Sequence, residues 1–429
     1  MSRFNYLLFL FLCTLVFQLS AQQAQSTDVL STSPVFLITD SLKNYADLGR
    51  FTMMHQAKNK PSLVKITRDS INYPFYNNLG NELKLELQNP DDGYWFYFKI
   101  ENTYEHLTEL ILTFENPLLR ELEFFEIKEK IEFHRHTGTQ LPFNSRLLTH
   151  RNFVFPLYFK AKEQKKFYVY INNAGLTTSI PIKLVKLNHF WQNTIIVQTK
   201  LGAYAMFIVL MTIAIVFLFV QVKNILVGYL GLYILLVGLW VLNKTGFAFQ
   251  FFWSSSSFLA QNADVLISFA LILTSLRLVF HFLEEYEYST ISLNFVLMPI
   301  YLFTFLLIFS FFVIYFESNW AYFILEYISF WSLILSQFGL IFSFLIVLIR
   351  RETQQKLILL IYIFIFLLPI LFLLPTSQKI ETYFYCSDLF LYSTICMIMS
   401  LVIIIIHPIK YFRNEKKLEI FASIKKLLK

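Results

Sequence analysis

Charged residues are scarce in this chain. Only 15% of its 429 residues are charged, whereas an ordinary soluble domain has about a quarter. Hydrophobic residues make up 56% of the chain, and phenylalanine alone occurs 49 times. A soluble fold cannot bury that much apolar side chain, so much of it is expected to face lipid. In a membrane protein, an excess of positive charge such as this net charge of +7 helps to set the orientation across the bilayer. No nucleic-acid partner is therefore expected.

Cysteine is also scarce, with only Cys13, Cys386 and Cys396 in the chain. Residues 26–200 contain none, so a domain there must fold without disulfides or a cysteine-based zinc site. The motifs of a nucleophile elbow, a zinc protease, a P-loop and a dinucleotide-binding turn are absent from the sequence as well. These absences predict a protein that is not an enzyme and that carries neither a metal nor another cofactor.

The chain begins with the features of a secretory signal peptide. Arg3 supplies a short basic start, residues 6–19 are apolar, and Ser20 and Ala21 are small. This order predicts a signal peptide over residues 1–21, with cleavage after Ala21 and export of the domain that comes next in the chain. An uncleaved membrane anchor remains the alternative.

Residues 26–190 show the alternation that is typical of β-strands. Charges are mixed, apolar residues alternate with polar ones, and turn residues separate short runs. Such strands at close spacing predict an all-β extracytoplasmic domain, an antiparallel jelly-roll-like sandwich. The clearest predicted strands are Glu82–Gln88, Tyr94–Glu101, Thr108–Glu115, Glu121–Ile127, Asn152–Phe159, Phe167–Asn172 and Ser179–Val185.

Residues 200–408 consist of long apolar runs. Each run reaches or nearly reaches the ~20 residues that cross the hydrocarbon core, and lipid offers no partner for an open backbone, so each is expected to be a helix. The sequence therefore predicts an all-α bundle of seven transmembrane helices, with glycines in the second run that suit close helix contact. The runs are 201–221, 225–242, 263–283, 295–316, 321–349, 357–375 and 384–407, and the glycines are Gly228, Gly231 and Gly238.

The distribution of basic residues gives the orientation. If the first domain is exported, the segments on the inner side hold eleven Lys and Arg, against two in the outer loops. This bias places the basic tail, residues 409–429, in the cytoplasm. The tail has apolar residues at helical spacing, which suits either a helix on the inner leaflet or the start of a coiled coil.

Several segments of the chain match the pattern of a known family. They are Tyr94–Asn102, Glu115–Leu122, Thr137–Phe143 with Arg146 and Arg151, Phe153–Leu157, Leu201–Tyr204, Tyr229–Tyr233 and Asn243–Trp253. In these the chain resembles bacterial seven-transmembrane receptors with diverse intracellular signalling modules, whose exported part is a jelly-roll-like domain. The resemblance covers about residues 35–412. It implies ligand sensing outside and relay through the helices to an effector, commonly a histidine kinase or a cyclic-di-GMP enzyme.

The effector of that family has no counterpart here. Only 21 residues follow Pro408, too few for a catalytic domain. The output is therefore expected to pass to a separate cytoplasmic signalling protein. A truncated receptor without output is the alternative, and a homodimer is left open.

The first candidate ligand site lies on the strand Tyr94–Ile100. Side chains alternate along a strand, so Trp95, Tyr97 and Lys99 share the face opposite the core residues Phe96, Phe98 and Ile100. Two aromatic rings beside a cation are suited to stack on a sugar and to bond its hydroxyls. Packing of Trp95 and Tyr97 under a neighbouring loop is the alternative.

Arg146 and Arg151 form a second candidate ligand site. They follow the basic segment His134-Arg135-His136 and flank His150, and they could hold an anion through charge-assisted hydrogen bonds. The alternative is a solvated loop whose arginines pair with local glutamates. His134 and His136 point the same way on a strand, but they lack a third ligand at suitable spacing, so no metal is expected.

Ionisable residues also occur in the apolar runs. Arg277, Glu326 and Asp388 are functional candidates because charges are costly in a bilayer. They could relay a signal between helices or only hold helices together.

These patterns together predict a receptor in the inner membrane of a bacterium, with its first domain in the periplasm and its C-terminus in the cytoplasm. The expected ligand is a small molecule, a carbohydrate or a carboxylate. The alternative is a transporter or membrane-embedded enzyme whose sandwich recruits substrate. A transporter would favour repeated groups of helices, and we find no such repeat in the sequence.

Overall fold

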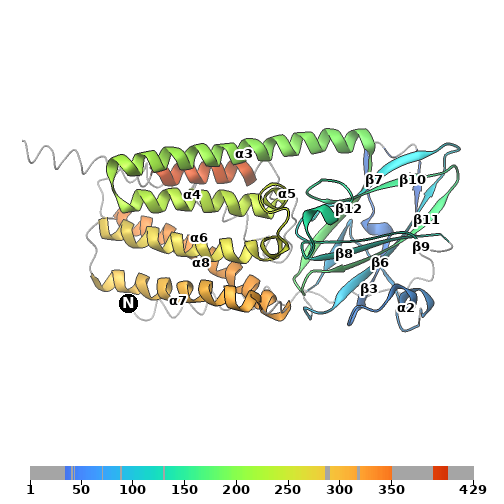
Figure 1. Cartoon of the computed structure of the whole chain (residues 1–429), viewed down its shortest axis with the longest axis horizontal. Coiled ribbons are helices and arrows are strands. Elements are labelled where there is room, and N and C mark those ends of the chain that lie inside the picture. Colours follow the sequence, from blue (N-terminus) through green and yellow to red (C-terminus); the bar gives the residue numbers. More distant parts are fainter. Residues whose placement is uncertain are drawn as a thin grey trace, which may run out of the picture.

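The structure is a computed structural model of the whole chain. It describes residues 34–349, except 40–41, 43, 70, 87–88, 129–130, 286–289 and 316–318, and also residues 390–403. The predicted signal peptide at 1–21, the apolar run 357–375, Asp388 and the tail 409–429 lie outside the described residues. Figure 1 shows a β domain at one end of the molecule and a bundle of helices at the other.

The β domain is a sandwich of two sheets. The seven-stranded sheet has the order β4-β3-β6-β11-β8-β9, with β1 parallel to β6, and the five-stranded sheet has the order β10-β7-β12-β2, with β5 beside β12. All other pairings are antiparallel. The strands are β1 Val35–Ile38, β2 Tyr45–Asp47, β3 Thr52–Ala57, β4 Tyr76–Asn77, β5 Glu82–Leu85, β6 Gly93–Asn102, β7 Thr108–Phe114, β8 Glu121–Ile127, β9 Ile131–Thr137, β10 Phe153–Phe159, β11 Gln164–Asn172 and β12 Thr178–Lys186.

Phenylalanine rings fill the space between the sheets. Phe124 on β8 stacks on Phe155 on β10, with ring centroids 4.2 Å apart, so the two sheets touch directly. Phe167 packs against Phe124 and against Phe98 on β6, and all four rings are at most 2% exposed. Each such ring contributes about 1.5–3 kcal/mol through burial, which explains how the domain is held without disulfides.

The seven predicted strands are confirmed, with ends that differ by a few residues. Strand β6 also has the predicted faces, since Phe96, Phe98 and Ile100 lie in the core between the sheets. Strands β1 to β4 and β9 were not predicted. Strand β9 lies at the edge of its sheet and only its last residue is buried, so it has no apolar alternation to mark it.

The helical part begins without a loop, because β12 ends at Lys186 and α3 starts at Leu187. Its helices are α3 Leu187–Val222, α4 Ile225–Lys244, α5 Phe247–Phe251, α6 Ser257–Glu285, α7 Thr290–Tyr315, α8 Asn319–Ile349 and a further helix at Phe390–Ile403. Among the described residues, α3, α4, α6 and α8 are long and apolar enough to cross a membrane. The number of seven spans stays a prediction.

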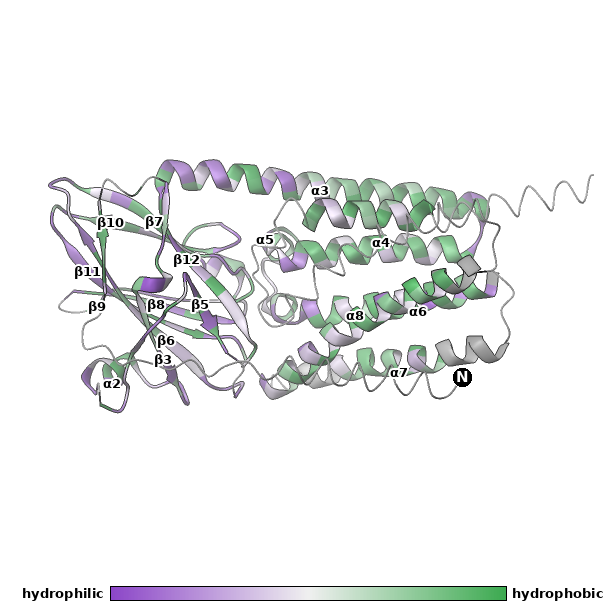
Figure 2. Ribbon diagram, turned by 180° about the vertical axis from the view of Figure 1, so that it is seen from behind, coloured by the Kyte–Doolittle hydropathy of each residue, from purple (hydrophilic) through white to green (hydrophobic). Residues whose placement is uncertain are grey.

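Helix α3 is longer than a membrane is thick. Its 36 residues span ~54 Å, whereas the hydrocarbon core needs only ~30 Å. The first turns of α3 therefore reach alongside the β domain, as Figures 1 and 2 show, and Figure 2 shows that they are more polar than the rest. The remainder carries exposed apolar side chains that suit contact with lipid, including Leu210, Phe217 and Val220.

Glycines bring α4 close to α3, as the sequence predicted. A methyl group at Gly238 would lie 2.4 Å from the Ile208 side chain of α3. At Gly231 and Gly228 the corresponding contacts would be 3.2 Å to Ile215 and 3.1 Å to Phe219. The two helices therefore pack more tightly than larger side chains would allow.

Candidate functional site

The β domain rests on the helix ends that face it, and the contacts there form a polar junction. The connection from α4 to α6, with the short helix α5, lies directly under the sandwich. The Phe143 N–H of the sandwich donates to the Ser254 carbonyl of this connection at 2.8 Å. The Phe143 ring meets Phe249 of α5 edge-on at 5.2 Å. Backbone and aromatic contacts thus join two parts that are distant in the sequence.

Arg146 is buried at this junction. Its guanidinium donates to the carbonyls of His150 at 3.0 Å, of Arg151, and of Pro117 at 2.9 Å. The rings of Phe143, Phe153 and Phe249 surround it at 4.2–5.3 Å. Burial, and then the charge of Arg151, lower the pKa of Arg146 well below its usual range, to about 9, so it stays charged at neutral pH. Arg146 therefore joins its own loop to the loop between β7 and β8.

Arg151 connects the same loop to the membrane helices. Its Nη1 donates to the carbonyl of Thr245, at the end of α4, at 3.2 Å. The next residue, Gly246, has φ of +75° and lies against Pro117, where a Cβ would approach the proline ring to 2.4 Å. A side chain at Gly246 would meet both backbone strain and a clash. This turn is therefore shaped to receive the sandwich.

Arg120 makes the second connection to the helices. Arg120 is the last residue before β8. Its Nη2 donates to Oε1 of Gln261 on α6 at 2.8 Å. Its guanidinium lies 4.0 Å from the ring centre of Tyr322 on α8. Nε and Nη1 have no hydrogen-bond partner within the part of the chain that the structure describes. One arginine of the sandwich thus touches two membrane helices at once.

Three charged side chains lie buried beside Tyr322, one from each of three helices. Nζ of Lys244 on α4 pairs with Asp264 on α6 and lies 3.6 Å from Oε1 of Glu326 on α8. We call these three residues the charged triad. Two carboxylates share one ammonium group, and their side chains are only 10–13% exposed. The triad holds three helix ends together immediately below the sandwich.

A small cavity of about 100 Å³ separates the charged triad from the sandwich. Asn116, Thr139 and Thr178 line it from the sandwich, and Asn243 and Tyr322 line it from the helices beside the triad. Asn243 Oδ1, Asp264 Oδ1 and Glu326 Oε2 are buried there without a hydrogen-bond partner among the described residues. Buried oxygens in a space of this size are suited to hold a few waters.

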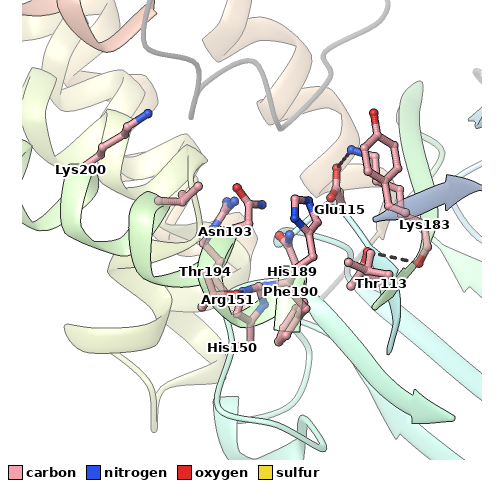
Figure 3. A pocket seen from close by; sticks show the side chains of 14 residues that line it. Thr113, Glu115, His150, Arg151, Lys183, His189, Phe190, Asn193, Thr194 and Lys200 are labelled. Atoms are coloured by element: carbon pink, nitrogen blue, oxygen red, sulfur yellow. Dashed lines mark hydrogen bonds and ion pairs between the residues drawn. The ribbon is translucent and has the colours of Figure 1, made fainter. Parts of the chain in front are cut away.

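A larger pocket of about 440 Å³ opens between the five-stranded sheet and the start of α3, and we call it the α3 pocket (Figure 3). Arg151, Lys183 and Lys200 line it, as do His150, His189, Asn193 and Thr194. Lys183 pairs with Glu115 at 2.6 Å. The wall of the pocket is therefore mainly basic and polar, and it combines residues of the sandwich with residues of a membrane helix.

His150 lies deep in the wall of the α3 pocket and is 6% exposed. Burial, and then the charge of Arg151, lower its pKa from 6.5 to about 3, so the imidazole is neutral at pH 7. Its Nδ1 accepts the Asn152 N–H at 3.0 Å, which leaves the proton on Nε2. Nε2 lies 3.4 Å from the Thr194 hydroxyl of α3. This histidine is a third polar link between the sandwich and the helices.

A comparison with protein families matches residues 52–186 to 7TMR-DISM extracellular 2, an extracellular domain of seven-transmembrane receptors. The match covers the sandwich from β3 to β12, and the apolar helices follow it directly. The chain fits a seven-transmembrane receptor with an extracellular β domain. No curated protein matches the chain significantly.

The residues of the first predicted ligand site differ in exposure. Trp95 is 1% exposed, because helix α2 (Leu63–Arg68) covers it and it packs on Phe125 and Tyr170. The expectation that Trp95 offers an open ring to a ligand is corrected by this burial. Tyr97 stays half-buried beside Tyr168 at 4.6 Å, with Lys99 Nζ 5.7 Å from its ring centre. A sugar-binding role stays a prediction for these two residues.

The basic residues of the second predicted ligand site also differ in exposure. His134 and His136 on β9 are exposed and lie near Glu123 and Glu121, in agreement with a solvated surface. Arg146, His150 and Arg151 are buried at the junction, so the solvated-loop alternative is wrong for them. His150 and Arg151 border the α3 pocket, whereas Arg146 bonds loop carbonyls. The anion site stays a prediction.

One group of possible metal ligands lies on the exposed face of the sheet. Ligand atoms of Glu121, Glu123 and His136 are within 4.8 Å of one another. The ammonium of Lys60 is already 2.5 Å from Glu121 and 2.7 Å from Glu123. A lysine in this position supplies the positive charge that a metal would bring, so these residues are explained by ion pairing.

Of the two candidates within the described helices, Glu326 belongs to the junction and Arg277 does not. Arg277 is half-buried on α6, eight residues before the helix ends at Glu285. Arg120, Lys244 and Asp264 were missed by the sequence interpretation. Lys244 lies near the start of the predicted outer loop 243–262, and Asp264 lies just after its end. A pair of opposite charges near the ends of two apolar runs was the available signal. Arg120 carried no signal of its own.

Proposed function

We propose that this chain is a receptor that senses a small ligand outside the cytoplasm and relays the event through its helices to a separate cytoplasmic protein. The observation that supports this most directly is the contact of Arg120 with Gln261 and Tyr322, beside the charged triad. A receptor needs a mechanical link between its ligand-binding domain and its helices, and this contact supplies one.

The link is suited to transmit a displacement of the sandwich. If the sandwich tilts, the Arg120 charge moves away from Tyr322 and from the cavity above the triad. The electrostatic attraction between the ammonium group and the two carboxylates of the triad then changes. The packing of α4, α6 and α8, which carry these groups, changes with it. A ligand shifts such an equilibrium only by the difference between its affinities for the two arrangements.

The placement of the receptor in the cell is proposed from the sequence. We propose a signal peptide at 1–21, a periplasmic sensor domain at 26–190, seven spans within 200–408 and a cytoplasmic tail at 409–429, in the inner membrane of a bacterium. The ligand proposed from the sequence is a carbohydrate or a carboxylate, and Tyr97 and Lys99 are the remaining sugar candidates. We propose no catalytic reaction for this chain, because the matched family is one of receptor sensor domains.

Cross-linking in living cells tests the relay. A photo-reactive amino acid at Asn224, in the turn between α3 and α4, reports which cytoplasmic proteins contact the inner face. The proposal predicts a discrete cross-linked product whose yield changes several-fold in Arg120→Gln. Arg50→Gln serves as the matched control, because Arg50 is exposed on the sandwich. A product that is absent in every growth condition, or that is the same in Arg120→Gln and in the wild type, would refute the relay.

A further inference from the structure

The α3 pocket has the size and position of a ligand site. Its volume of about 440 Å³ lies within the usual range for small-molecule pockets, ~300–1,000 Å³, which often form where two domains meet. One wall is the five-stranded sheet, through Thr113, Glu115 and Lys183, and the opposite wall is α3. Figure 3 shows side chains from both walls around one space. A molecule bound there would touch the sensor domain and a membrane helix together.

The charge of the pocket selects the chemistry of its ligand. Three permanent cations, Arg151, Lys183 and Lys200, face one carboxylate, Glu115, among the lining residues that the structure describes. Hydrogen-bond donors accompany them, in the side chains of His189, Asn193 and Thr194. Ammonium groups and neutral donors that approach from several directions suit a tetrahedral anion, whereas a planar carboxylate is best met by a bidentate arginine.

The position of Lys200 along α3 indicates how deep the pocket lies relative to the membrane surface. Residues Leu201–Val222 of α3 span ~33 Å, which matches the ~30 Å hydrocarbon core. Lys200 therefore lies at the outer headgroup layer, and His189 lies ~16 Å farther out along the helix. The pocket extends from the level of lipid phosphates to the aqueous side of the sandwich. A phosphate group could enter it from either direction.

We propose that the α3 pocket binds a phosphate group, carried by a soluble molecule or by the headgroup of an anionic lipid. Lys200 and Asn193 of α3 hold it from the helix side, and Lys183 and Arg151 hold it from the sandwich. The bound phosphate bridges the sandwich and α3 and favours the arrangement in which both walls are near. The sensory role of this site rests on the proposed receptor function, whereas binding itself does not.

Binding is measured on the purified full chain in dodecyl maltoside micelles, which contain no phosphate. In the first arm, glycerol 3-phosphate is titrated by calorimetry in Tris buffer. In the second arm, phosphatidylglycerol is added and retained lipid is counted by native mass spectrometry. Lys200→Gln removes one exposed cation of the pocket and is expected to weaken binding about fivefold, as loss of a partly exposed ion pair does. Lys166→Gln, exposed on β11, is the matched control and leaves binding unchanged.

A second variant reverses the sign of the effect. Glu115→Gln removes the carboxylate that opposes the anion and is expected to tighten binding about threefold. Weaker binding in Lys200→Gln is therefore not explained by general damage if Glu115→Gln binds more tightly. Each variant is first checked for an unchanged melting temperature.

The two arms separate the sources of the phosphate. Titration of glycerol 3-phosphate with this variant pattern identifies a soluble ligand, and lipid retention alone with the same pattern identifies a headgroup. Binding in neither arm, or equal binding in Lys200→Gln and Lys166→Gln, would overturn the proposal. Intact phosphate binding with no Arg120-dependent cross-link would instead refute the receptor relay and leave the site standing.

Discussion

Removal of the lysine from the charged triad is the most demanding perturbation of the junction. Lys244→Met keeps an unbranched side chain of nearly the same length but leaves Asp264 and Glu326 together without their cation. At the 3.6 Å separation of Lys244 and Glu326, an effective dielectric constant of ~20 gives an attraction of about 5 kcal/mol. Desolvation offsets part of this attraction. Breaking such buried pairs costs ~3–5 kcal/mol, and we expect a loss in that range.

The assay is thermal unfolding of the purified full chain in micelles, followed by tryptophan fluorescence. A loss of ~3–5 kcal/mol corresponds to a decrease of roughly 10 °C in the melting temperature. Lys166→Met on the exposed face of β11 is the control and should shift the melting temperature by less than a few degrees. The triple variant Lys244→Met, Asp264→Asn, Glu326→Gln removes all three charges. It should recover most of the loss, because no uncompensated carboxylate is left buried.

Two results would refute this reasoning. If Lys244→Met melts at the temperature of Lys166→Met, the lysine does not stabilise the helix ends as the structure indicates. If the triple variant is no more stable than the single one, the loss comes from packing and not from unpaired carboxylates.

Three further predictions concern the junction and the sandwich. Gly246→Ala should destabilise by about 1–3 kcal/mol in chemical denaturation because of its positive φ and its contact with Pro117, whereas Gly202→Ala, with open space around it, should be neutral or stabilising. The pKa of His150 is lowered to about 3 in the folded protein, whereas the unfolded chain binds a proton there as the pH falls below 6.5. The free energy of unfolding should therefore decrease below pH 6.5, by about 2 kcal/mol at pH 5. In urea titrations, His150→Gln should flatten this dependence on pH. Trp95→Ala should cost about 3–5 kcal/mol of unfolding free energy and leave any sugar binding by Tyr97 unaltered.

The elements with regular periodicity were predictable from the sequence. Burial alternates along strand β6 from Phe96 to Asn102, and the apolar runs of α3 and α4 have membrane length, so both types of element followed from the pattern of side chains alone. The short strands β1 and β2 and the edge strand β9 were not predictable, since their pairing depends on the neighbouring strands and not on their own residues.

The candidate site was less accessible to sequence reasoning. Arg120 and Gln261 are separated by 141 positions, and no local pattern brings them together. Arg146 was expected at a ligand, but the buried carbonyls of its own loop receive its hydrogen bonds, and Arg151 donates to Thr245 besides bordering the α3 pocket. The alternation along its strand places Trp95 on the face opposite the core. Helix α2 covers this face, and the pattern of strand residues does not predict that helix. Tertiary contacts decide each of these cases.

Cysteine accessibility tests the central claim, that the sandwich lies on one side of the membrane and the turn between α3 and α4 on the other. Cys13, Cys386 and Cys396 are replaced by serine, and Lys166→Cys or Asn224→Cys is added. Cells with a permeabilised outer envelope are treated with a membrane-impermeant maleimide. We expect the cysteine at position 166 to be labelled at once and the cysteine at position 224 to be labelled only after the cells are lysed. Equal labelling of both positions in intact cells would contradict the claim.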